Sequence, residues 1–146
     1  NLLNEKSKLK TSSIRTDMQE TMQKYASVYK DTELLQTGLT EVKKLYNKKF
    51  SINDKSQIWN TDLIESLELQ NMLMLAYITI SASLFREESR GSHYRNDFPY
   101  RNDKKWMYHT LSYLQNNNIY NTKFNVNFKS LYPKEMDVIP PAKRTY

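Results

Sequence analysis

The N-terminal part of the chain carries apolar side chains at helical spacing. Between residues 14 and 29 they recur every three or four positions, with Gln, Glu, Lys and Asp between them. This period predicts an amphipathic helix. Ser12 or Ser13 is expected to cap its start, after an extended leader over residues 1–10. The apolar stripe consists of Ile14, Met18, Met22, Tyr25 and Tyr29.

A second apolar stripe follows Asp31-Thr32, which is the next pair able to cap a helix. Gly38 lies on this stripe, and a glycine inside a helix costs about 1 kcal/mol relative to alanine. We therefore expect a close contact between helices at Gly38. The stripe consists of Leu35, Leu39, Val42 and Tyr46, joined by Leu34 and Leu45.

A third helix is expected from about Asp62 to Leu84, capped by Asn60-Thr61. Residues 47–60 before it are polar and predict a loop, which Trp59 is expected to order. Residues 72–80 are almost entirely apolar, which predicts burial on all sides, yet the run is too short to span a membrane. One face is expected to carry Leu63, Leu67, Met74, Ile78 and Leu84.

The period changes in the last third of the chain. Asn102 or Asp103 is expected to cap a short helix through His109, and Phe124, Val126 and Phe128 alternate as in a strand. Leu111 to Leu114 are expected to pair with that strand across an Asn-rich turn. Pro140-Pro141 predict an extended ending.

The predicted fold is mainly α, in a single helical domain over residues 1–146. It is an antiparallel three-helix bundle followed by a polar loop, a short helix, a small β-hairpin and an extended C-terminal arm. The bundle is assigned to residues 12–85, the polar loop to 86–110, and the hairpin and arm to 111–146.

Composition removes several classes of site. The chain has 146 residues, a net charge of +6, no cysteine and two glycines. Cysteine-based metal sites and nucleophiles are excluded, as is a glycine-rich phosphate loop. The positive charges are spread along the chain, whereas proteins that bind phosphate backbones cluster them. Because the sequence begins with Asn, we expect a preceding portion to have been removed or to lie elsewhere.

The polar loop holds most of the candidate chemistry. Arginines and lysines alternate there with aspartates and glutamates, which favours ion pairs that fix the loop over a surface of one sign. Gly91 predicts either a positive φ or a close approach by another chain. Glu87 and Glu88 are also candidates for general acid–base work, but their neighbouring arginines favour structural pairing.

Two other kinds of site are considered for the same loop. His93 and His109 are too far apart in sequence to place three metal ligands on one element. Arg90 and Arg95 alternate with aromatic residues, as in proteins that stack on single-stranded nucleic acid. The acidic residues of the loop would repel phosphate, so this interpretation is the weaker one.

The residues resemble a known family. The loop reads ESRGSH at residues 88–93, followed by Arg95, Asp97 and Pro99, then RND at 101–103, Trp106 and HTL at 109–111. These motifs resemble the C-terminal region of the flavoprotein subunit of succinate dehydrogenase and fumarate reductase. Met-Gln at 18–19 and 22–23, SLELQNM at 66–72 and the ending PPAKRTY at 140–146 extend the resemblance from about residue 11 to residue 146.

The sequence departs from the family pattern at three positions. Ser92 replaces the usual Ala, and Asn96 and Asn102 stand where an acid is common. These changes reduce the negative charge of the loop, so one arginine is expected to have fewer partners.

The resemblance implies a helical domain that packs on a flavin-binding domain, close to an iron–sulfur subunit. The family's flavin fingerprint and its catalytic residues lie in preceding domains, so no catalytic, cofactor-binding or metal-binding residue is carried over to this chain. FAD is expected on a partner chain. Our first hypothesis is a separate polypeptide that completes a split flavoprotein subunit of respiratory complex II; a fragment of one longer subunit would make the same contacts.

The expected partners are the FAD-binding chain, the iron–sulfur subunit and the larger membrane-anchored complex, with no nucleic acid. The matrix side of the mitochondrial inner membrane is the expected location, with the cytoplasmic face of a bacterial membrane as the alternative. A stand-alone basic nucleic-acid-binding module and a non-catalytic accessory subunit of complex II remain alternatives. The expected docking residues are Arg86, Glu88, Ser89, Arg90, Gly91, His93, Arg95, Asp97, Trp106, His109, Lys143 and Arg144.

Overall fold

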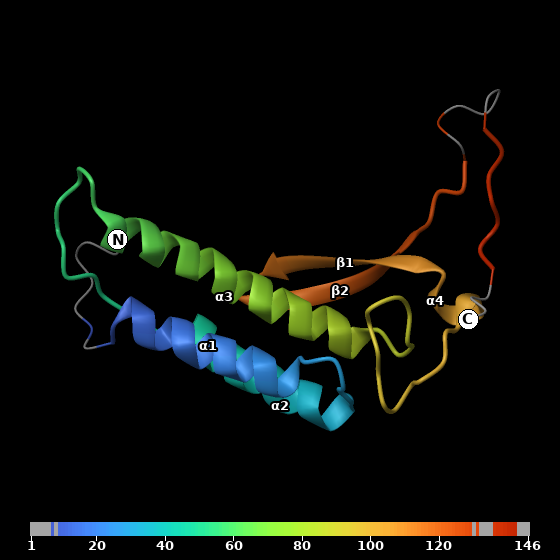
Figure 1. Ribbon diagram of the computed structural model, residues 1–146, viewed down its shortest axis with the longest axis horizontal. Helices are drawn as coiled ribbons and strands as arrows, with labels where there is room; N and C mark the ends of the chain where they lie inside the picture. The colour runs from blue at the N-terminus through green and yellow to red at the C-terminus, as the bar shows by residue number, and fades with distance from the viewer. Residues whose placement is uncertain (1–6, 8, 130, 132–135, 143–146) are drawn as a thin grey trace.

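The computed structural model describes residue 7, residues 9–129, residue 131 and residues 136–142. Each of the three long helices runs antiparallel to the one before it in the chain. A two-stranded hairpin lies along α3 on the side away from α1 and α2 (Figure 1). The predicted mainly α fold with a small hairpin is confirmed. Its elements are α1 (Thr11–Tyr25), α2 (Thr32–Tyr46), α3 (Thr61–Phe85), α4 (Asp103–Trp106), β1 (Tyr108–Gln115) and β2 (Asn118–Asn125).

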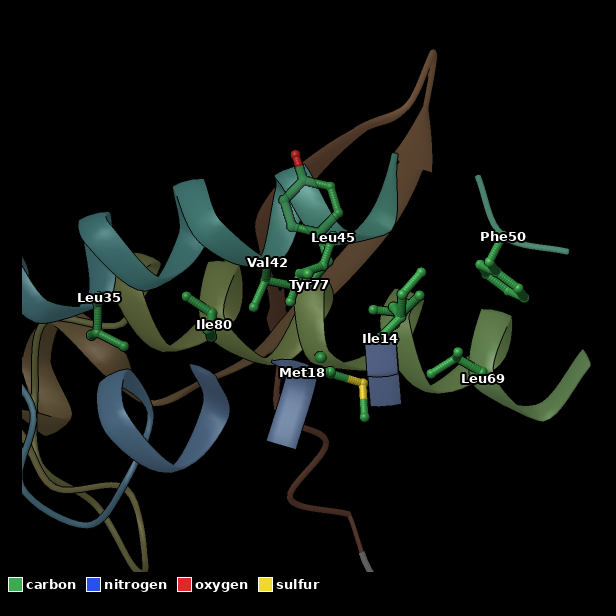
Figure 2. Packing of buried hydrophobic residues seen from close by; sticks show 11 residues of the cluster. Ile14, Met18, Leu35, Val42, Leu45, Phe50, Leu69, Tyr77 and Ile80 are labelled. Carbon is green, nitrogen blue, oxygen red and sulfur yellow. The ribbon is translucent and has the colours of Figure 1, made fainter. Parts of the chain in front are cut away.

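The core lies where one face of each long helix meets the other two (Figure 2). Apolar residues at helical spacing face inward from α1, α2 and α3, and Phe50 closes the end of the bundle. Burial of such stripes is what stabilises helices of this length in water. The buried cluster consists of Ile14, Met18, Leu35, Val42, Leu45, Phe50, Leu69, Leu73, Ala76, Tyr77 and Ile80.

Gly38 lies at a close contact between helices, as expected. A Cβ added to Gly38 would lie 2.5 Å from the Cβ of Tyr25 and 3.3 Å from Cδ1 of Ile80. The absence of a side chain therefore allows α1 and α3 to approach α2.

Two of the three predicted helix starts are confirmed. Oδ1 of Asp31 accepts a hydrogen bond from the Leu34 N–H (3.0 Å), and Oδ1 of Asn60 accepts one from the Leu63 N–H (2.8 Å). The predicted serine cap of α1 is wrong. Lys10 occupies that position and its side chain makes no capping hydrogen bond; the buried Thr11 hydroxyl pairs with that of Ser66 at 2.8 Å.

The predicted stripe of α1 extends too far. The helix ends at Tyr25, and Tyr29 lies in the following turn with 70% of its surface exposed. Its ring contacts the edge of Tyr94 in the polar loop, with 5.9 Å between the ring centroids. A contact outside the helix therefore accounts for this aromatic residue.

The predicted buried face of α3 is wrong. Leu67 and Leu75 are exposed, and burial on all sides over residues 72–80 is not observed. Apolar residues surround most of this helix, so their period does not select a face. The face that packs on α1 and α2 includes small residues, which allow close approach. The buried residues of α3 are Ser66, Leu69, Leu73, Ala76, Tyr77, Ile80 and Ser81.

Trp59 does not order the loop before α3, contrary to expectation. Its side chain is 96% exposed, whereas Phe50 and Ile52 are buried. The loop is ordered by polar contacts: Nδ2 of Asn60 donates to the carbonyl oxygens of Asp54 (2.9 Å) and Ser56 (2.8 Å).

The hairpin is confirmed, with shifted ends. The turn between its strands has positive φ at Asn116 (50°) and Asn117 (58°), as tight hairpin turns require. The short helix α4 ends at Trp106 rather than His109, because pairing of β1 with β2 begins at Tyr108. His109 consequently lies in β1 opposite Phe124, and β2 ends before Val126 and Phe128.

The hairpin is attached to the bundle through Nδ2 of Asn121, which donates to Oγ of Ser81 (2.7 Å). Residues 136–142 of the predicted arm have no regular helix or strand and run back toward α4 (Figure 1). Lys143 and Arg144 lie outside the described residues. Within the described parts of the chain, none of the helices has the length and hydropathy needed to cross a membrane.

Candidate interface site

Residues 86–110 are the polar loop, which is called the docking loop from here on because it holds the expected docking residues. The loop leaves the end of α3 through a tight turn at Gly91. The N–H groups of Arg90 and His93 each donate to the other residue's carbonyl oxygen, at 2.8 and 3.0 Å. Gly91 has a φ of 59°, and a Cβ added there would meet no atom within 4 Å. The glycine is therefore required for its positive φ rather than for close packing.

Glu88 is the centre of a buried charge network. Its carboxylate has no exposed surface and accepts hydrogen bonds from Arg86, from Nε (2.8 Å) and Nη2 (3.1 Å) of Arg90, and from the Asn102 N–H (2.9 Å). Burial alone would raise the pKa of Glu88, but these hydrogen bonds outweigh burial and hold the pKa below its ordinary value. The network joins the end of α3 to the start of α4.

Arg95 connects the loop to two helix ends. Its buried guanidinium forms a two-point ion pair with Asp97, and Nη1 donates to the carbonyl oxygens of Ser83 (3.0 Å) and Leu84 (3.3 Å). A cation at the last turn of α3 satisfies carbonyls that have no partner within the helix.

The carboxylate of Asp97 reaches the first turn of α2. It accepts hydrogen bonds from the N–H (2.9 Å) and the hydroxyl of Thr32. The Arg95 guanidinium, with these contacts to Thr32, holds the pKa of Asp97 far below its ordinary value. Thr32 is a site residue that the sequence analysis missed, and its cap-like position was the only signal for it.

Ser89 and His93 hold the loop in shape. The Ser89 hydroxyl donates to the Phe98 carbonyl (2.8 Å) and accepts from the Arg95 N–H (2.9 Å). The half-buried His93 ring has Nε2 3.3 Å from the Arg86 carbonyl oxygen. Burial, reinforced by nearby cations including Lys30, lowers the pKa of His93.

Trp106 is buried between two cations. Nζ of Lys123 lies 3.8 Å from a ring centroid of Trp106, and Cζ of Arg86 lies 5.5 Å away. The ring also meets Phe85 edge to face, with 5.5 Å between centroids. Lys123 comes from β2, and nothing in the sequence pattern identified it.

Asp103 connects the loop to the C-terminal arm. It forms ion pairs with Arg90 and, through both oxygens, with Arg101 at 2.6 and 2.7 Å. Hydrogen bonds from Arg101 and Arg90 lower the pKa of Asp103 to about 2. Arg101 also donates to the Ala142 carbonyl at 3.1 Å, so the arm passes this edge of the loop.

Mutual pairing of the loop charges is confirmed. The expectation that one loop arginine has fewer partners is wrong. The arginines at 86, 90, 95 and 101 all contact carboxylates. Asn96 and Asn102, which stand where an acid is common, do not leave a loop arginine without a carboxylate partner. Asn102 itself caps α4 by accepting from the Lys105 N–H. Across the described residues, no buried side-chain nitrogen or oxygen lacks a hydrogen-bond partner.

The described residues supply neither a metal-ligand cluster nor a dinucleotide-binding turn. Of these residues, no three His, Cys, Asp or Glu side chains are grouped so as to hold a metal ion. The turn that holds a dinucleotide in Rossmann-type folds is glycine-rich and lies at a helix N-terminus. Gly38 instead lies inside a helix contact and Gly91 in a salt-bridged loop, so neither glycine provides such a turn.

Two apolar surfaces face outward. On α3, Ile64, Leu67 and Leu75 are 57%, 48% and 61% exposed and lie on one side of the helix, with the exposed polar residues Glu68 and Asn71 between them. On the hairpin, the rings of Tyr113 and Tyr120 stack across the strands with 5.7 Å between centroids. The exposed hairpin face also carries Leu111 and Phe124.

Comparisons with known proteins identify the family of this chain and agree with its fold. The family model for the fumarate reductase flavoprotein C-terminal region matches residues 15–146. The chain is 43% identical over 136 residues to the succinate dehydrogenase flavoprotein subunit of Rickettsia bellii, covering 91% of this chain and 23% of that protein. It is 40% identical over 147 residues to the mitochondrial flavoprotein subunit of succinate dehydrogenase [ubiquinone] from Oryza sativa, covering 99% of this chain and 23% of that protein.

Among solved structures, a chain of Escherichia coli quinol fumarate reductase superimposes with a TM-score of 0.85 and 27% identity. That match covers 97% of this chain and 24% of the other. The chain thus spans about a quarter of the length of the relatives it matches. It belongs to the succinate dehydrogenase and fumarate reductase flavoprotein family, of which it represents the C-terminal domain.

Proposed function

We propose that this domain structurally completes the flavin-bearing part of a succinate dehydrogenase and carries none of the redox chemistry itself. The supporting observation is the outward α3 stripe, formed by Ile64, Leu67 and Leu75 on the longest helix of the bundle. Three large apolar side chains exposed on one side of a helix favour a surface that another protein covers. The relatives contain a further three quarters of chain that could cover this stripe.

The docking loop has two kinds of residue in this proposal. Glu88 and Arg95 are buried and bound within the chain, so they act by holding the loop in shape. Gly91 and His109 are exposed and are positioned to contact the partner. Because the loop is already fixed by ion pairs, little conformational entropy is lost when it docks.

The partner in this proposal is the FAD-binding chain of the flavoprotein subunit, next to the iron–sulfur subunit in a larger membrane-anchored complex. The partner would take a hydride from succinate onto its flavin, and electrons would continue through iron–sulfur centres to quinone. The relative from Oryza sativa is mitochondrial, and the proposal places the assembly at the inner membrane, on the matrix side. The finer hypothesis is that this domain and the flavin-bearing chain are separate polypeptides.

The proposal is tested by adding the 146-residue chain to the flavin-bearing polypeptide of the same cells, freed of this region where the two are continuous. Unfolding of the flavin-bearing polypeptide on heating is followed by the change in flavin fluorescence. Binding to the native state raises the unfolding temperature of the flavin protein as the concentration of added chain increases. An unfolding temperature that stays constant at every concentration would contradict the proposal.

A further inference from the structure

The loop before α3 ends in two large apolar side chains that face solvent. Ile58 is 76% exposed and Trp59 is 96% exposed, and they are adjacent in sequence. An exposed tryptophan forgoes the favourable free energy of burying its ring, and tryptophan is among the residue types enriched in the energetically dominant contacts of protein interfaces.

The backbone at Trp59 is unusual. Its φ is 55°, which is in the left-handed region that bulky residues rarely adopt. Such strain persists only where the surroundings impose it, and it is concentrated at functional sites. Trp59 is therefore presented to solvent by a loop that holds it against its own preference.

The surrounding loop supplies that constraint through polar contacts. Oδ2 of Asp62 accepts from the Asn53 N–H (3.0 Å), Oδ1 of Asp54 accepts from the Ser56 N–H (2.8 Å), and the Ser56 hydroxyl donates to the Ile58 carbonyl (3.2 Å). With the two amide contacts of Asn60, these bonds fix both sides of the tip. The tip is thus pre-organised, which reduces the entropy lost on binding.

We propose that Ile58 and Trp59 form an anchor that inserts into an apolar pocket of the flavin-bearing part of the flavoprotein, an inference that rests on the proposed function. The indole N–H would donate to an acceptor in that pocket, since a buried tryptophan usually finds a partner for this group. The anchor adds a specific contact at the end of the bundle opposite the docking loop (Figure 1).

Two observations favour this occupant over others. Ile64 and Leu67, the first members of the exposed α3 stripe, follow Trp59 by five and eight residues, so one partner can cover the tip and the stripe together. The charges beside the tip are of both signs, at Asp54, Lys55 and Asp62. A membrane-binding tip would instead be expected to carry a basic surface toward anionic lipid.

The test measures binding of the 146-residue chain to the flavin-bearing polypeptide by titration calorimetry, for the unchanged chain and three tip variants. Trp59→Ala removes the anchor. Trp59→Gly also removes the anchor. Because glycine relieves the positive-φ strain, we expect the Trp59→Gly chain to remain folded. Trp59→Phe keeps an aromatic ring but no N–H. Gln57→Ala, at an exposed position of the same loop, is the matched control.

We expect Trp59→Ala and Trp59→Gly to weaken binding about 30-fold, as for dominant interface tryptophans. Trp59→Phe is expected to recover part of that loss, and Gln57→Ala to bind as the unchanged chain does. Circular dichroism of the Trp59→Gly chain provides the folding control.

Equal binding of the unchanged chain and both truncated variants would overturn the anchor and leave the proposed function in place. No binding by the unchanged chain would overturn the proposed function, and the anchor with it. Trp59→Ala could instead abolish association with anionic vesicles, or dimerisation, while binding to the flavin protein persists. Either result would assign the tip to another occupant and also overturn the proposal.

Discussion

Arg95 and Asp97 form a two-point ion pair, with Nε of Arg95 2.8 Å from Oδ1 of Asp97 and Nη2 2.7 Å from Oδ2. The arginine is fully buried, whereas the carboxylate retains 28% of its side-chain exposure. The pair lies between the last turn of α3 and the first turn of α2, so it fixes how the loop leaves the bundle.

Asp97→Asn is expected to destabilise the chain strongly. It leaves a buried guanidinium without a charge partner, and because Asp97 is partly exposed the cost is below the value of about 3–5 kcal/mol for breaking a fully buried pair. Urea unfolding followed by circular dichroism measures the loss. Glu41→Gln is the control, because its pair with Lys44 is exposed and contributes about 0.5 kcal/mol or less. Equal losses in the two variants would refute the assigned role.

Acid is expected to destabilise the folded chain through the loop carboxylates. The pKa values of Glu88, Asp97 and Asp103 are all lower in the folded state than their ordinary values. The unfolded chain therefore takes up protons first, so the stability contributed by these groups is complete above about pH 5 and is lost as pH falls. For Asp103 the loss extends from pH 3.8 down to about 2.

The matching experiment is a thermal unfolding series from pH 7 to pH 2. Glu88→Gln is expected to have a lower Tm at pH 7 and a smaller decline of Tm below about pH 5. Parallel curves for the variant and the unchanged chain would show that Glu88 does not contribute to the acid sensitivity.

Gly38→Ala is expected to destabilise the bundle even though alanine favours helices. The added methyl group would lie 2.5 Å from Cβ of Tyr25, an atom fixed close to the α1 backbone. Overpacking of this kind costs about 1–3 kcal/mol, which exceeds the gain of about 1 kcal/mol in helix propensity. Chemical denaturation compares it with Thr40→Ala, an exposed position of the same helix. A more stable Gly38→Ala chain would contradict the close contact.

Arg90→Ala is expected to weaken association with the flavin-bearing chain about tenfold. The change removes contacts to Glu88 and Asp103, so the start of α4 loses its attachment to the loop. Quantitative co-purification measures the effect, with Lys44→Ala as an exposed control. Unchanged recovery of the Arg90→Ala complex would count against the docking role of the loop.

Much of the fold follows from the sequence. The helix caps at Asp31 and Asn60, the contact at Gly38 and the turn at Gly91 each depend on a local requirement that one residue type satisfies. The pairing of charges within the docking loop was also predictable, because neighbouring opposite charges with arginine favour two-point pairs.

The rest depends on contacts between distant residues. The inward face of α3 could not be chosen from an almost continuous apolar run, and the buried residue Ser66 was hidden by its polarity. Trp59 was expected to lie inside its loop because apolar bulk usually does, but its place is set by polar contacts of Asn60 and Asp62. Lys123 reaches Trp106 only through the hairpin register.

Native purification of the tagged chain from its own cells, with mass identification and flavin absorbance of what is recovered, tests the central claim most directly. The account predicts a stable assembly with flavin in stoichiometric amount, bound by a polypeptide homologous to the preceding portion of the succinate dehydrogenase flavoprotein. Recovery of the chain as a solitary, flavin-free monomer would contradict it.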